Sequence, residues 1–186
     1  MVWDQTFASN RLGWPDAPDS TAWLAPDGYH LATRQPGHFV AVEPAETLSL
    51  QAGQVSASFR KMGGPPGGGY GIIVHDQGPG PRDGLDQTGR YDVLEASHTG
   101  AVGVWRREND HWVDLIPWQP TPAVHVGTEE NELRIGANGP ELLLVVNGVE
   151  VARYVDPTLA SGSVGVFVGG DGNEALLSRL VVEALG

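Results

Sequence analysis

Short runs of strictly alternating apolar and polar residues recur along this 186-residue sequence, and they constrain its fold more than any other feature. In one run, Val55, Ala57 and Phe59 alternate with polar residues. A period of two places successive side chains on opposite faces of a β-strand, whereas a helix needs a period of 3.6. No stretch has a convincing helical period. The pattern therefore predicts an all-β chain whose strands each have one buried and one wet face.

Gly, Pro, Asn and Asp separate these runs at spacings typical of antiparallel sandwiches and barrels. Asn147-Gly148, between two apolar runs, predicts a two-residue hairpin turn. The connections are short and lack helices, which excludes parallel βαβ winding. We predict strands over residues 28–33, 38–42, 54–61, 69–76, 91–97, 101–107, 111–118, 131–137, 141–146, 149–155, 163–169 and 175–183.

The length fits one domain, which we predict to span residues 1–186. The 26 glycines and 14 prolines are explained by turns rather than by disorder. Two irregular segments, 62–69 and 77–89, are predicted loops. Long loops on a rigid sandwich often carry binding sites, although ordinary solvated connections explain these two equally well. The sequence has no cysteine, so disulfides contribute nothing.

The formal net charge of −12 narrows the classes of partner. Binding to phosphate backbones and anionic lipid surfaces depends on cationic side chains, and here 23 acidic residues outnumber 11 basic ones. Nucleic-acid binding is therefore disfavoured. The sequence opens with no basic start and no apolar run, so neither a signal peptide nor membrane insertion is predicted.

Several segments resemble, in order, a bacterial family of concanavalin A-like modules. They are residues 55–74 around a Gly-Pro loop, the predicted hairpin 91–105, and the segments 131–135, 144–148 and 161–168. The resemblance implies a two-sheet antiparallel jelly-roll sandwich, often the tail of a larger secreted or membrane-anchored protein, and hence an extracytoplasmic location. It implies little about activity, because lectins, glycosidases and adhesion modules share this scaffold.

An enzymatic role is disfavoured by the segment Arg90-Tyr-Asp-Val-Leu-Glu95. The resemblance implies catalytic carboxylates in the pattern Glu-x-Asp-x-x-Glu for retaining glucanases of this fold, and Arg90 stands where the nucleophile is needed. In a regular strand, Asp92 and Glu95 also face opposite sides. A broader glycoside-directed hydrolase is an alternative if Glu95, Asp92, His75 and His98 gather near one sheet.

The tryptophans indicate a binding face. Trp105, Trp112 and Trp118 lie on neighbouring predicted strands, and strict alternation puts Trp112, Asp114, Ile116 and Trp118 on one face. Flat rings stack on sugars, and charged or polar groups bond the hydroxyls, although core packing also explains such rings. The candidate ligand-binding residues are Arg60, His75, Tyr91, Glu95, Trp105, Arg107 and Trp112. The amino-terminal Trp3, Trp14 and Trp23 are interpreted as structural, because their segment resembles the opening strand that closes against the carboxy-terminal strand in such modules.

Asp171 and Asn173 are candidate calcium ligands, although a turn rich in Asp and Asn explains the same residues. No other cofactor is predicted. The leading hypothesis is a non-catalytic, lectin-like module that binds a glycan on a concave sheet. A structural or protein-interaction module, with a protein partner on the same face, and a glycoside-directed hydrolase are the alternatives.

Overall fold

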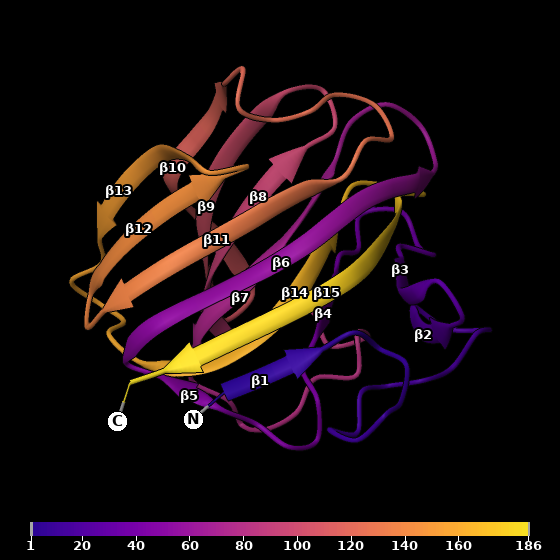
Figure 1. Ribbon diagram of the computed structural model, residues 1–186, viewed down its shortest axis with the longest axis horizontal. Helices are drawn as coiled ribbons and strands as arrows, with labels where there is room; N and C mark the ends of the chain where they lie inside the picture. The colour runs from indigo at the N-terminus through magenta and orange to yellow at the C-terminus, as the bar shows by residue number, and fades with distance from the viewer. Residues whose placement is uncertain (1, 186) are drawn as a thin grey trace.

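A computed structural model describes residues 2–185, which form fifteen strands and, within that range, no helix. The strands stack as two layers, with β6, β11, β12 and β15 in front of β7, β8 and β9 (Figure 1). Their bounds are β1 (Val2–Gln5), β2 (Ala22–Ala25), β3 (Gly28–Ala32), β4 (Val40–Val42), β5 (Ser49–Leu50), β6 (Ala52–Gly63), β7 (Gly69–Asp76), β8 (Arg90–Ser97), β9 (Ala101–Glu108), β10 (His111–Pro120), β11 (Asn131–Asn138), β12 (Glu141–Val146), β13 (Val149–Val155), β14 (Gly162–Gly169) and β15 (Glu174–Ala184).

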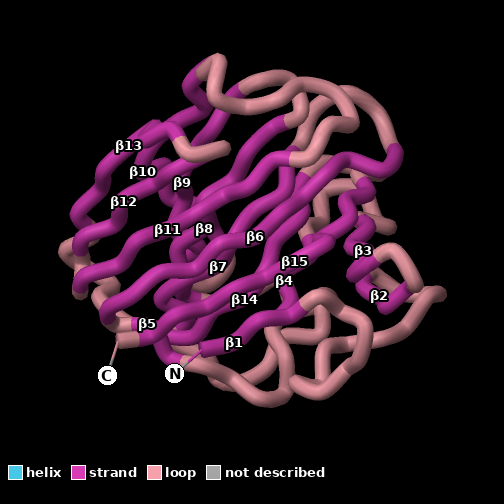
Figure 2. Tube along the Cα trace, in the orientation of Figure 1, coloured by secondary structure: helices cyan, strands magenta, loops and turns pink. Residues whose placement is uncertain are grey.

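Every strand pair within the two sheets is antiparallel, which confirms the predicted jelly-roll sandwich. The first sheet has the order β13-β12-β11-β6-β15-β3-β2, with β1 also on β15. The second has the order β10-β9-β8-β7-β14-β4, with β5 also on β14. Figure 2 shows how loops gather at the ends of the sandwich. No helix in the described part of the chain is long and apolar enough to cross a membrane.

The alternation in the sequence determines which side chains form the core between the sheets. On β6, Val55, Ala57 and Phe59 are at most 1% exposed, whereas the intervening serines are half-buried. Apolar residues from both sheets join them in one cluster. At about 25 cal/mol per Å² of apolar surface removed from water, this burial is the main stabilising contribution to the fold.

The Asn147-Gly148 turn joins β12 to β13 as predicted. Both residues have positive φ, 49° at Asn147 and 80° at Gly148, which is the conformation that tight hairpin turns require. The Asn147 side chain also accepts a hydrogen bond from the backbone amide of Glu132 at 2.8 Å. The turn therefore sets the pairing of Val146 with Val149 and ties the hairpin to β11.

The amino-terminal segment closes the first sheet. Trp3 on β1 lies opposite Val182 on β15, so the predicted opening strand does close against the carboxy-terminal strand. Trp14 is 2% exposed and packs against the ring of Tyr29 at 5.3 Å. Trp23 on β2 is half-buried and stacks on His30 at 5.1 Å. All three indoles therefore pack within or beside the first sheet.

Candidate functional site

The outer face of the second sheet carries the candidate site on β8, β9 and β10. Because these strands pair in register, side chains facing away from the core line up in rows across the three strands. One row is Tyr91, Arg107 and Trp112; the next is Val93, Trp105 and Asp114; a third begins with Glu95 and Gly103. The face therefore has an aromatic end and an end with carboxyl groups.

The register of β10 against β9 shifts twice, between Asp114 and Ile116 and again between Ile116 and Gln119. Asp114 pairs with Trp105 and Ile116 pairs with Val104, so Leu115 is an extra residue in the ladder. Ile116 consequently packs against the core, and the prediction that it shares a face with Trp112 and Asp114 is wrong, because strict alternation ends at the bulge. Pro117 and Trp118 come back to the outer face.

The aromatic end of this face is closed by packing. Phe39, which precedes β4, meets the Trp112 ring at 5.1 Å and the Phe167 ring of β14 at 5.4 Å. The Arg107 guanidinium lies 5.0 Å from the centre of the Trp112 ring, and its Nε and Nη2 both donate to the carbonyl of Gln87. Phe39, Tyr91 and Phe167 are at most 8% exposed. These residues belong to a small second hydrophobic cluster, separate from the core between the sheets.

The loop 77–89 covers that closed end. Its Arg82 forms a buried ion pair with Asp76 and stacks over the Tyr91 ring at 4.8 Å. Burial raises the pKa of Tyr91 far above its ordinary range. Gln87 exchanges side-chain hydrogen bonds with the backbone of Phe39, donating to its carbonyl at 2.8 Å. These contacts hold the loop in place over the closed end of the face.

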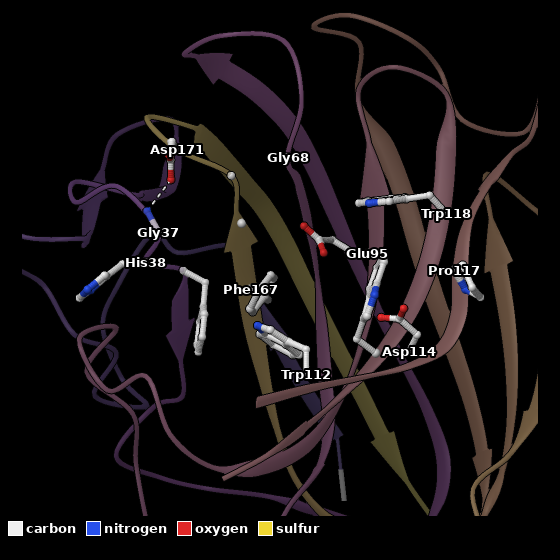
Figure 3. A pocket seen from close by; sticks show the side chains of 14 residues that line it. Gly37, His38, Gly68, Glu95, Trp112, Asp114, Pro117, Trp118, Phe167 and Asp171 are labelled. Carbon is white, nitrogen blue, oxygen red and sulfur yellow. Dashed lines mark hydrogen bonds between the residues drawn. The ribbon is translucent and has the colours of Figure 1, made fainter. Parts of the chain in front are cut away.

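The other end of the face is open and holds a cavity of about 540 Å³ (Figure 3). Trp118 is 43% exposed, and its ring meets that of Trp105 edge-on at 4.7 Å between centroids. The Trp105 ring lies directly over Gly103, since a Cβ placed on that glycine would come within 2.0 Å of the ring atom Cη2. Trp105 and Trp118 therefore bound this part of the cavity, with the Trp105 ring held flat against the sheet.

Glu95 sits at the floor of this cavity and is only 7% exposed. Glycines make room for it, because a Cβ on Gly69 would lie 2.8 Å from its Oε1 and one on Gly169 would lie 3.0 Å away. Its side chain points into the cavity, and no described residue gives it a hydrogen bond or ion pair (Figure 3). Burial raises the pKa of this carboxyl to about 8, so it is largely protonated at neutral pH.

The rim of the cavity adds polar groups. His38, Asp114 and Asp171 are exposed at its edge, and Asp171 accepts a hydrogen bond from the amide of Gly37 at 2.7 Å. Among the described residues that line the cavity there is no lysine and no arginine. The arrangement offers aromatic rings, one protonated acid and two exposed carboxyl groups to a ligand.

The structure brings three of the predicted ligand residues to the cavity, namely Glu95, Trp105 and Trp112. Tyr91 and Arg107 lie on the same face, but both side chains are buried by packing at the closed end. Tyr91 is completely buried, so it is not accessible to a ligand.

Arg60 and His75 are corrections to the predicted set. Arg60 is exposed on β6 of the other sheet, and nothing in its alternation could tell one sheet from the other. His75 is fully buried, with its Nδ1 3.1 Å from Oδ2 of Asp92. A φ of 58° at His75 departs from strand geometry, which the sequence did not indicate.

Asp92 and Glu95 face opposite sides of the sheet, as strict alternation predicts, because β8 pairs with β9 without a bulge. Asp92 is fully buried and lies beside Asp156, which Arg106 binds at 2.9 Å. Burial, together with the neighbouring Asp156, raises the pKa of Asp92 to about 6. Of the four groups that the hydrolase alternative named, Asp92 and His75 are in contact, whereas Glu95 faces the cavity on the other side of the sheet.

The two calcium candidates have different surroundings. Asn173 is 2% exposed, its Oδ1 accepts from the Lys61 ammonium at 2.5 Å, and its Nδ2 donates to the carbonyls of Gly69 and Gly169. A cation already occupies the oxygen that a metal would need. No cluster of three metal-binding side chains occurs among residues 2–185. Only Asp171 of this pair reaches the cavity.

Two groups of cavity residues were absent from the predicted set. Trp118 and Asp114 were placed on the face by alternation, and the pairing of Asp114 with Trp105 is the register signal that identifies Asp114. His38, Phe39 and Phe167 come from segments far away in the sequence, and no local pattern links them to β9 and β10.

No protein-family model matches this chain, and no curated protein does. Solved structures do match. A carbohydrate-binding module, CBM66 from Bacillus subtilis, is 14% identical with a TM-score of 0.65, covering 97% of this chain and 95% of its own. A Bacillus licheniformis β-glucanase is 11% identical with a TM-score of 0.62, covering 99% and 98%. Sheep galectin-11 is 14% identical with a TM-score of 0.51, covering 84% and 98%. At these identities the likeness concerns the fold.

Proposed function

We propose that this chain, which has the jelly-roll fold of the concanavalin A-like superfamily, is a carbohydrate-binding, lectin-like module. The observation that carries the proposal is the open cavity in which two indoles stand beside a buried carboxyl group without a partner. A carbohydrate-binding module and galectins among the similar structures support it.

A sugar has an apolar ring face and polar hydroxyl groups, and the cavity has both aromatic and polar side chains to contact them. The apolar face of a sugar ring stacks on an indole, and the exposed Trp118 and the flat Trp105 offer such surfaces. Hydroxyl groups need both donors and acceptors. Protonated Glu95 donates, and the exposed Asp114 accepts. A buried donor left without a partner costs about 1–3 kcal/mol, so a ligand oxygen that satisfies Glu95 gains affinity.

A glycan array, followed by melting curves with and without each sugar found, tests this function. Trp118→Ala should weaken binding by about 10- to 100-fold while leaving the domain folded, as the loss of a stacking residue does at binding sites. Trp23→Ala is the matched control, because it removes a half-buried indole from the other sheet. A blank array would point to a protein interface on this face, and equal effects of the two variants would place the sugar elsewhere.

A glycoside-directed hydrolase is the second candidate, since Glu95 and Asp114 are two carboxyl groups on one cavity. Inverting enzymes combine an acid of raised pKa, as Glu95 is here, with a second carboxyl group that acts as base. Release of reducing ends from bound oligosaccharides, lost in both Glu95→Gln and Asp114→Asn, would establish it. Intact sugars after prolonged incubation would leave binding as the function.

A further inference from the structure

The cavity is lined by acidic side chains without basic lysine or arginine partners in its described lining. Its described lining includes three acidic side chains, Glu95, Asp114 and Asp171, and no lysine or arginine. Arg107 and Lys61 are engaged elsewhere, since Arg107 donates to the carbonyl of Gln87 and Lys61 donates to Asn173. With a formal net charge of −12, the whole chain also attracts cations toward such a cavity.

The surroundings of Glu95 are a second, independent observation that points to a ligand in the cavity. Its side chain is more than nine-tenths buried, points into the cavity and has no partner among the described residues. The strands packed around it contribute Gly69, Gly103 and Gly169, and its raised pKa has no contribution from a neighbouring charge. The charged or titratable groups facing the same space are Asp114, Asp171 and His38.

The paired indoles suit a cation as well as a sugar face. Trp105 and Trp118 meet edge-on at 4.7 Å between centroids, so their rings are not stacked face to face, and both residues line the cavity. An ammonium group near the face of a tryptophan is attracted by the ring's negative face, and the attraction grows as water is excluded. Aromatic faces beside carboxylates are therefore a general receptor for a positively charged nitrogen.

We propose that the cavity selects glycans that carry a free amine, with the sugar ammonium bound between Glu95 and the two indoles; this rests on the proposed carbohydrate-binding function. When the ammonium enters, the O–H bond of the Glu95 carboxyl breaks and its proton passes to solvent, leaving a carboxylate paired with the ammonium. Acetylation of the amine removes the charge, so it removes the basis for selection.

The comparison uses tetramers of glucosamine, N-acetylglucosamine and glucose, titrated into the intact chain at about pH 6, where the amine is charged. The glucosamine tetramer should bind at least about tenfold more tightly than the other two. Calorimetry in two buffers of different ionisation heat should show a proton released for that ligand alone. Because the complex holds fewer protons, its affinity should rise with pH between about 5 and 7, by up to about tenfold per unit.

Glu95→Gln should remove the preference and the proton release, whereas Glu46→Gln, which neutralises an exposed carboxylate outside the cavity, should keep both. Equal binding of all three tetramers would overturn the amine selection and leave the carbohydrate-binding function standing. Equal binding of a lysine tetramer would replace it with a general ammonium receptor. Binding of none of the four would overturn both proposals.

Discussion

Charged and aromatic side chains occupy both ends of the outer face of the second sheet. At one end they contact other protein groups, and at the other they are open to a ligand. At the closed end, Arg107 is held by Gln87 and stacked on Trp112, and Tyr91 lies beneath Arg82. At the open end, Glu95 has no partner among the described residues and Trp118 is 43% exposed. An aromatic-rich sheet face is therefore not by itself a binding site.

The difference lies in what covers the rings. The loop 77–89 and Phe39 fill the closed end with protein atoms, so its charged and aromatic groups contribute to stability. Glycines line the open end, and space remains there for a ligand. Substitutions at the closed end should therefore change the free energy of unfolding, and those at the open end should change binding.

Arg82→Met should show the largest effect. It removes the partner of Asp76, whose carboxylate would remain buried without a counterion, and breaking such a buried pair costs about 3–5 kcal/mol. Urea unfolding measures the loss. Sugar affinity of the variant that remains folded should be unchanged. Lost binding at unaltered stability would mean that the closed end belongs to the site.

Glu95→Gln should change how stability depends on pH. The pKa of Glu95 is raised from 4.5 to about 8, so between these values the folded chain keeps a proton that the unfolded chain has lost. The parent should lose stability as pH rises through this window, by up to about 1.4 kcal/mol per unit, and the variant should lack this contribution. Unfolding at about pH 5 and pH 7.5 gives the difference, which should approach 3 kcal/mol. Parallel profiles would show that the carboxyl is solvated.

Trp112 lies between the two ends of the face. Trp112→Ala therefore tests whether this ring contributes to stability, to binding or to both. The ring is half-buried against Phe39 and Phe167 but also lines the cavity, so we expect a loss of about 2 kcal/mol together with weaker binding. Chemical denaturation and sugar titration on the same sample separate the two. Unchanged stability would make Trp112 solely a ligand platform.

Trp118→Ala should have the smallest effect on stability, at most about 1 kcal/mol, because much of the ring already contacts water. Its melting temperature should stay close to that of the parent while its sugar binding is weakened. A large drop in melting temperature would show that the exposed ring supports the β10 bulge rather than a ligand.

The sequence was sufficient for the sandwich because period two and turn residues are local signals. The alternation in β6 and the positive φ values at Asn147-Gly148 follow from side-chain patterning and glycine chemistry within a few residues. The short strands β1, β2 and β5 had no such pattern, and the strand containing Trp3 was expected only from the resemblance.

The candidate site was only partly predictable. Glu95, Trp105 and Trp112 were placed correctly on a shared face because β8, β9 and β10 are neighbours in sequence and in space. Arg60 and His75 were misplaced because alternation defines two faces of a strand but not which sheet the strand joins or which face is the core. The bulge at Leu115 depends on the tertiary ladder, and no residue type marks it.

Gly103 gives the cavity a property that none of its ligand-facing side chains has. A methyl group there would collide with the Trp105 ring, so the ring would have to stand up from the sheet. A single alanine at a position that need never touch a sugar would thus tilt the indole and reshape the recess. Related chains could acquire a different ligand preference by changing this one backbone position, with every recognition group left intact.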